Sequence, residues 1–175
     1  MSGAFDPSNL TALVIDDNSY QRGITLDQLR AMGFGRAVGA GGIAEALDCL
    51  QNNNPNIILL EWLAGGDQLD FVRRVRNSED VPDRAVSIFM LTNRGAKGDV
   101  EKARRAGVNG YLRKPISLRS MQVRVRAVMV NPQPFVVTAN YIGPCRRWRA
   151  DPSFMGPRRR LRDDAEQTLP AIDDE

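Results

Sequence analysis

Short runs of apolar residues alternate along the chain with segments of helical periodicity. Residues 10–15, 57–60 and 86–91 are almost entirely apolar, which is typical of strands buried on both faces of a sheet. Residues 36–40 and 110–112 are weaker strand candidates. Strict alternation of strands and helices implies a parallel sheet covered by helices on both faces. The apolar spacing between the strands predicts five helices, at about 19–32, 43–50, 68–76, 98–106 and 117–130.

Polar residues stand at the carboxyl ends of four of these strands. Asp16 and Asp17 follow the first strand, Glu61 ends the third, Thr92 ends the fourth and Lys114 follows the fifth. Right-handed crossovers bring these ends to one edge of the sheet, where open α/β sheets bind their ligands. Taken singly, each residue is explained by a turn, a helix cap or a loop. Together, in this order, they predict a site.

The residue types at this edge indicate a particular chemistry. Two adjacent carboxylates and a third from a neighbouring strand form an oxygen-rich pocket suited to Mg²⁺. The hydroxyl of Thr92 and the ammonium of Lys114 would bind the oxygens of a phosphoryl group.

Composition narrows the class of protein. The 175 residues are 42% hydrophobic and 26% charged, which is ordinary for a globular domain. We find no run of about 18 apolar residues and no charged-then-apolar leader, and we therefore expect a cytoplasmic protein. The absence of histidine excludes histidine-based catalysis, histidine metal ligation and phosphorelay through a histidine of this sequence. Cys49 and Cys145 lack metal-ligand spacing and are too few for a disulfide framework. A net charge of +3 does not by itself indicate nucleic acid.

Several motifs together resemble the receiver domain of bacterial two-component response regulators, as in single-domain chemotaxis regulators. The resemblance covers residues 10–130, with a leader at 1–9 and an extension at 131–175. It implies a flavodoxin-like (CheY-like) five-stranded parallel sheet in the order 2-1-3-4-5. The matching segments are residues 14–18, 45–47, 57–62, 90–92, 106–111 and 112–115.

The resemblance also implies roles for the residues at the sheet edge. Asp16, Asp17, Glu61 and the backbone carbonyl of Leu63 would hold Mg²⁺. Thr92 would bind a phosphoryl oxygen, and Lys114 would pair with the acceptor carboxylate or its phosphoryl group. Tyr111 stands at the aromatic switch position of the family, where it would act together with Thr92.

The phosphoacceptor position departs from the family. The family has aspartate there and this chain has Glu61. Its extra methylene moves the carboxylate by about a bond length, and a misplacement of about 1 Å can cost ~100-fold in rate. Alternatively, the longer side chain pairs directly with Lys114 and imitates the phosphorylated state. The loop 63–68 is one residue shorter than usual, and Asn93 replaces a small residue, so we predict lost or altered phosphorylation.

The chain changes character after residue 130. Residues 131–134 break the last helix, and 135–138 could be a short strand or docking segment. A repeat then places arginines after Gly-Pro, interpreted as a turn, at 143–144 and 156–157. We expect residues 165–175, which are acidic, to be disordered. The predicted partner-binding residues are Arg146, Arg147, Trp148, Arg149, Arg158, Arg159, Arg160 and Arg162.

Three hypotheses for function remain open. The first is an atypical receiver that acts by protein–protein interaction with a sensor histidine kinase or another signalling protein, with or without bound Mg²⁺. The second is a receiver that accepts phosphate from a histidine kinase. The third is a nucleic-acid-binding regulator that uses residues 141–162. A free-standing enzyme is the least favoured reading, and we expect no membrane insertion. Basic residues on the fourth and fifth helices also suit a homodimer or an acidic or phosphate-rich partner: Lys97, Lys102, Arg104, Arg105, Arg119, Arg124 and Arg126.

Overall fold

A five-stranded parallel sheet in the order β2-β1-β3-β4-β5 forms the centre of the computed structural model, which describes residues 5–93, 97–146 and 167–169. The predicted fold and strand order are confirmed. The strands are β1 (Thr11–Ile15), β2 (Arg36–Ala40), β3 (Ile57–Glu61), β4 (Ser87–Thr92) and β5 (Gly110–Arg113). The helices are α1 (Ser19–Ala31), α2 (Ile43–Asn53), α3 (Gln68–Asn77), α4 (Lys97–Ala106) and α5 (Leu118–Val130).

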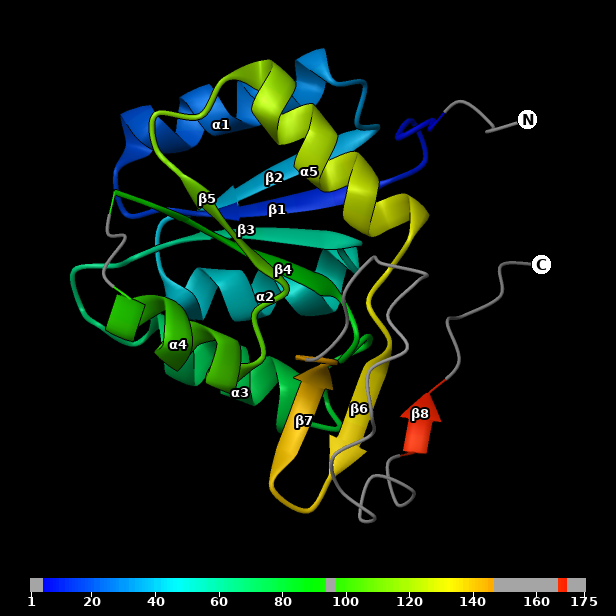
Figure 1. Ribbon diagram of the computed structural model, residues 1–175. Coiled ribbons are helices and arrows are strands. Elements are labelled where there is room, and N and C mark those ends of the chain that lie inside the picture. Colours follow the sequence, from blue (N-terminus) through cyan, green and yellow to red (C-terminus); the bar gives the residue numbers. More distant parts are fainter. Residues whose placement is uncertain (1–4, 94–96, 147–166, 170–175) are drawn as a thin grey trace.

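The helices form two layers around the sheet. Helices α1 and α5 cover one face, while α2, α3 and α4 cover the other (Figure 1). Alternate residues of β1 serve the two layers: Leu13 and Ile15 join the core with α2, α3 and α4, and Ala12 and Val14 join the core with α1 and α5. Strands β1 and β3 are therefore apolar at nearly every position, because both of their faces are buried.

Local signals set the ends of α1 as predicted. The Asn18 side chain accepts a hydrogen bond from the backbone N–H of Gln21 at 3.0 Å, which caps the first turn. At the other end, Gly33 has a φ of 91°, a conformation that glycine adopts without the strain a side chain would bring. These two ends fix where β1 stops and β2 begins, and thereby place Asp16 at the sheet edge.

A small antiparallel sheet follows α5, with strands in the order β7-β6-β8. Strand β6 (Phe135–Thr138) confirms the predicted short strand. The interpretation of Gly143-Pro144 as a turn is wrong, because both residues belong to β7 (Tyr141–Pro144). Within the predicted disordered segment, β8 (Gln167–Leu169) pairs with β6. The second copy of the arginine repeat lies outside the described residues.

The hairpin of β6 and β7 packs against the α/β domain at the end of α3 and α4 (Figure 1). The backbone of β7 lies close to the backbone that follows α4, because a Cβ added to Gly143 would lie 3.1 Å from the Cα of Gly107. Phe135 and Val136 are buried, and the Arg76 guanidinium lies 5.7 Å from the Phe135 ring centroid, so the hairpin packs over the end of α3. Across the described residues, no helix is both long and apolar enough to cross a membrane.

Candidate functional site

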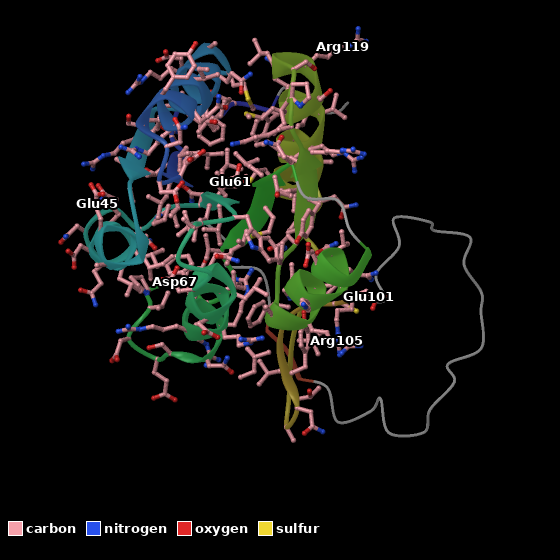
Figure 2. All side chains as sticks on the ribbon, turned by 90° about the vertical axis from the view of Figure 1, so that its left-hand side faces the viewer. Glu45, Glu61, Asp67, Glu101, Arg105 and Arg119 are labelled. Carbon is pink, nitrogen blue, oxygen red and sulfur yellow. The ribbon has the colours of Figure 1, made fainter. Side chains whose placement is uncertain are left out.

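An ion-pair network joins three strand ends at the carboxyl edge of the sheet. Lys114 Nζ lies 3.2 Å from Asp16 Oδ2 and also forms an ion pair with Glu61 Oε2. Asp16 is 2% exposed, and the side chains of Lys114 and Glu61 are each 14% exposed. Figure 2 shows Glu61 at the level of the sheet, apart from the outer helix positions of Glu101 and Arg119. Three of the four charged residues predicted to meet at this edge, Asp16, Glu61 and Lys114, therefore do meet.

The register of the parallel strands explains this convergence. Ile15 pairs with Leu60, so Asp16 and Glu61 leave neighbouring strands at the same level. Glu61 pairs with Leu91, one residue before Thr92. The backbone N–H of Lys114 donates to the carbonyl of Thr92 at 3.1 Å, which extends the ladder by one residue and sets the start of the lysine side chain.

The charge balance of the network is visible in the pKa of Lys114. Burial lowers the pKa of this ammonium, but hydrogen bonds and electrostatic attraction from Glu61 and Asp16 outweigh burial. The net pKa of Lys114 lies above its ordinary value of 10.5. Lys114 is therefore a fixed cation at neutral pH, and its position between two carboxylates is electrostatically favourable.

The three carboxylates also have local hydrogen-bond donors. Asp16 Oδ1 accepts from the backbone N–H of Asn18 at 2.9 Å, and Asp17 Oδ2 accepts from that of Ala64 at 3.0 Å. Glu61 Oε1 accepts from the backbone N–H of Trp62 at 2.7 Å. Each carboxylate thus faces a donor from its own or the adjacent loop.

The predicted Mg²⁺ ligands are not gathered around one point in this structure. Among the described residues, no three acidic, cysteine or histidine side chains stand where they could hold one ion. Lys114 occupies the space between Asp16 and Glu61, and Asp17 points to the loop. The carbonyl of Leu63, the fourth predicted ligand, accepts from the backbone N–H of Gly66 at 3.1 Å. The predicted magnesium ligands stay a prediction.

The predicted switch residues, Thr92 and Tyr111, lie between this edge and α4. Thr92 is 1% exposed at the end of β4. The hydroxyl of Tyr111 donates to the carbonyl of Asp99 in α4 at 3.1 Å. Burial, followed by the charge of Asp99, raises the pKa of Tyr111 to about 12. The neutral phenol is therefore the form that links β5 to the first turn of α4.

Only one of the predicted partner-binding residues lies in the described part of the chain. Arg146 is exposed, and its guanidinium lies 4.1 Å from the centroid of the Tyr141 ring. The remaining predicted residues lie outside the described ranges, and they are Arg147, Trp148, Arg149, Arg158, Arg159, Arg160 and Arg162.

Sequence reasoning missed two arginines. Arg22 Nη1 donates to the backbone carbonyl of Asp16 at 2.5 Å, so it helps to hold the loop that carries Asp16 and Asp17. Arg76 is 0% exposed near the opposite edge of the sheet. A signal for Arg76 was present, because it lies four residues after Val72 on the apolar stripe of α3. No comparable sequence signal singles out Arg22.

The fold and the carboxylate–lysine edge together define a receiver-type signalling domain. The sequence profile of the response regulator receiver domain matches residues 12–126. The chain therefore belongs to the response regulator receiver family. Receiver domains interact with histidine kinases and other signalling proteins in two-component systems and typically bind Mg²⁺.

Individual relatives agree with this family. The chain is 30% identical over 126 residues to the phosphate regulon transcriptional regulatory protein PhoB of Escherichia coli, a match that covers 71% of this chain and 54% of that protein. It is 30% identical over 119 residues to the chemotaxis protein CheY1 of Helicobacter pylori, with 67% of this chain and 94% of that protein covered. The chain thus spans about half the length of the PhoB regulators that it matches.

Solved structures give the same result. A putative response regulator from Chloroflexus aurantiacus has a TM-score of 0.63 at 27% identity, covering 70% of this chain and 98% of that chain. A response regulator from Thermotoga maritima has a TM-score of 0.62, covering 73% and 100% of the two chains at 23% identity. Each match covers less than three quarters of this chain, so part of the chain has no matched counterpart in either structure.

Proposed function

We propose that this receiver signals through protein–protein contacts and that the ion pair of Glu61 with Lys114 replaces ordinary phosphotransfer. In this proposal Glu61 holds the phosphoacceptor position and keeps the carboxylate edge in one charge state. The partner is a sensor histidine kinase or another signalling protein in the cytoplasm. The contact surfaces are the arginines of the extension and the outer faces of α4 and α5, which could also form a homodimer.

The single observation that carries the proposal is the position of the Glu61 carboxylate. It reaches Lys114, and the same ammonium bonds to Asp16. The family resemblance implies that Lys114 pairs with the acceptor carboxylate or its phosphoryl group, and that Thr92 binds a phosphoryl oxygen. A standing Glu61–Lys114 pair engages, without a covalent step, the ammonium that a phosphoryl group would use. A bound Mg²⁺ would be held by Asp16, Asp17, Glu61 and the Leu63 carbonyl, beside the Lys114 ammonium.

The test is the intact mass of the full chain after incubation with Mg²⁺ and a small acyl phosphate donor. Three proteins are compared: the natural chain, Glu61→Asp and Glu61→Gln. We expect a phosphoryl adduct on the Glu61→Asp protein alone, because that substitution restores the family acceptor with the shorter side chain. The Glu61→Gln protein is the matched control, because it lacks an acceptor carboxylate but keeps the side-chain length.

The other outcomes distinguish the rival functions. An adduct on the natural chain that is absent from Glu61→Gln would overturn the proposal and identify a working phosphoacceptor. If no protein gains mass, the short loop 63–68 and Asn93 close the site even to an aspartate. Salt-sensitive binding of duplex DNA that is lost on neutralising Arg146 and its neighbours would favour the nucleic-acid hypothesis instead.

A further inference from the structure

Three arginines from two separate parts of the chain line one hollow at the junction of α4 and β7. Arg104 and Arg105 belong to the last turn of α4, and Arg146 follows β7. The hollow has a volume of about 290 Å³, and Glu101 is the acidic residue that lines it. Figure 2 shows Glu101 and Arg105 on α4, with Arg105 nearer to the hairpin of β6 and β7. We call these three arginines the basic junction.

The basic junction is held together by the extension. Arg104 Nη2 donates to the backbone carbonyl of Arg146 at 2.9 Å. The guanidinium of Arg146 stacks 4.1 Å from the Tyr141 ring centroid, and the Tyr141 hydroxyl in turn donates to the carbonyl of Pro144 at 2.8 Å. Two of the three cations are therefore oriented before any ligand arrives, which reduces the entropic cost of binding.

The charge at the junction is not neutralised within the described residues. None of the three arginines forms an ion pair there, whereas Arg30 and Arg73 on other helices pair with aspartates three residues away. Arginines in the last turn of a helix do favour the helix dipole, which accounts for Arg104 and Arg105. It does not account for Arg146, which a different element brings to the same hollow.

We infer that the basic junction binds a small ligand with two adjacent phosphate groups. Guanidinium groups match phosphate oxygens through paired hydrogen bonds. Three arginines against Glu101 leave a local charge of about +2, which a diphosphate group complements. Figure 2 shows Arg105 of the basic junction well apart from Glu61. Ligand binding at the junction therefore does not depend on the proposed loss of phosphotransfer.

Ligand binding at the basic junction should affect Tyr111, the predicted switch residue, which lies close by. A second hollow of about 150 Å³ adjoins the first and is lined by Arg104, Arg146 and Tyr111 among others. Tyr111 also bonds to Asp99 in α4. A ligand that draws Arg104 and Arg146 together therefore acts on the helix that Tyr111 holds.

The experiment is a titration of the full chain, labelled at tyrosine, with inorganic diphosphate in the absence of Mg²⁺. The chain has three tyrosines, so each gives its own NMR signal. We expect the Tyr141 signal to shift in a saturable way, with a smaller shift at Tyr111. Tyr20, which is 73% exposed on α1, serves as the remote internal control and should not shift.

Matched variants locate the site. Arg105→Gln and Arg146→Gln should each weaken diphosphate binding by about tenfold, the factor expected for one lost hydrogen bond to a charged group. Arg36→Gln removes an exposed arginine from β2 and should leave binding within twofold. Equal affinity in all three variants would overturn the inference and indicate attraction to net charge alone. Equal affinity for sulfate and diphosphate would overturn the diphosphate assignment, and a saturating titration that leaves Tyr141 unmoved would overturn the site.

Discussion

Two cations, the largely buried Lys114 and the fully buried Arg76, occupy opposite edges of the central sheet and are stabilised in different ways. Lys114 at the carboxyl edge lies between the carboxylates of Asp16 and Glu61. Arg76 at the amino edge has no carboxylate within ion-pair distance in the described residues. It donates instead to backbone carbonyls and one amide oxygen, those of Gly107, Arg84, Val86 and Asn109, at 2.6–3.0 Å.

The pKa shifts of the two cations have opposite signs. Carboxylates raise the pKa of Lys114 despite its burial. Burial lowers the pKa of Arg76 to about 10, and the charges of Tyr141 and Asp83 offset only part of that effect. The charge of Lys114 is balanced by two side chains, so a single substitution can alter that balance. A charge surrounded by carbonyls depends on the fold that positions them, so the Arg76 edge is structural and the Lys114 edge is adjustable.

The largest effect is expected for Arg76→Leu. The buried carbonyls of Gly107 and Val86 would lose this donor, and each such group costs about 1–3 kcal/mol. Some relaxation follows, so we expect a loss of about 3–4 kcal/mol in the free energy of unfolding, measured by urea denaturation. Arg73→Leu on the same helix, where the arginine is exposed, should change stability by less than about 0.5 kcal/mol. Equal losses in the two variants would contradict the structural role of Arg76.

The next largest effect is expected for Lys114→Met. The carboxylates of Asp16 and Glu61 would face each other without a cation, at a cost of about 2–3 kcal/mol. Adding Glu61→Gln removes one of the two charges and should recover about 1 kcal/mol. The double-mutant cycle, followed by urea denaturation, measures this coupling. Additive effects would show that the Glu61–Lys114 pair contributes nothing to stability.

A smaller effect is expected for Gly107→Ala at the Arg76 edge. Gly107 has a φ of 108°, and an added Cβ would lie 2.9 Å from the Cγ of Arg76. Backbone strain and this close contact should cost about 2 kcal/mol. Gly23→Ala in α1 is the control, because its Cβ would meet nothing within 4 Å and alanine favours a helix by about 0.5–1 kcal/mol. Thermal melts of both variants should therefore shift in opposite directions.

The smallest effect is an alkaline loss of stability at the Lys114 edge. Because the folded pKa of Lys114 lies above 10.5, its charge stabilises the fold fully below that pH, and this contribution is lost as the pH rises through the folded value. The difference in unfolding free energy between the natural chain and Lys114→Met should therefore shrink above pH 10.5, by about 1.4 kcal/mol for each pH unit by which the folded pKa exceeds the ordinary one. Subtracting the variant removes the titration of tyrosines, which both proteins share. A difference that grows with pH would contradict the sign.

The sequence predicted most of the main sheet because its strands are buried on both faces. The uninterrupted apolar runs ending at Ile15 and Leu60 are hard to assign otherwise. The edge residues followed from topology, and one of the two alternatives for Glu61, direct pairing with Lys114, is the geometry observed. Asp17 could not be placed, since a carboxylate after a strand can turn to a loop N–H as easily as to a metal.

Strand β7 and the burial of Arg76 were missed for related reasons. Gly143-Pro144 carries the usual signal of a turn, yet glycine is needed there because Gly107 approaches so closely. Arg76 lies on an apolar stripe, but arginine is rarely buried without a carboxylate. Both features depend on contacts between α3, α4 and the extension, which local periodicity does not report.

The backbone contact between Gly107 and Gly143 has a consequence for how this domain can be recombined with others. The hairpin covers Arg76, whose guanidinium lies 5.7 Å from the Phe135 ring centroid, so a receiver cut at the end of its family match at residue 126 would open that buried cation to water. In chimeras, this receiver should be exchangeable only as a unit that reaches at least Arg146. Transplanting the hairpin onto another receiver should likewise succeed only where the recipient offers an arginine and a glycine at the equivalents of positions 76 and 107.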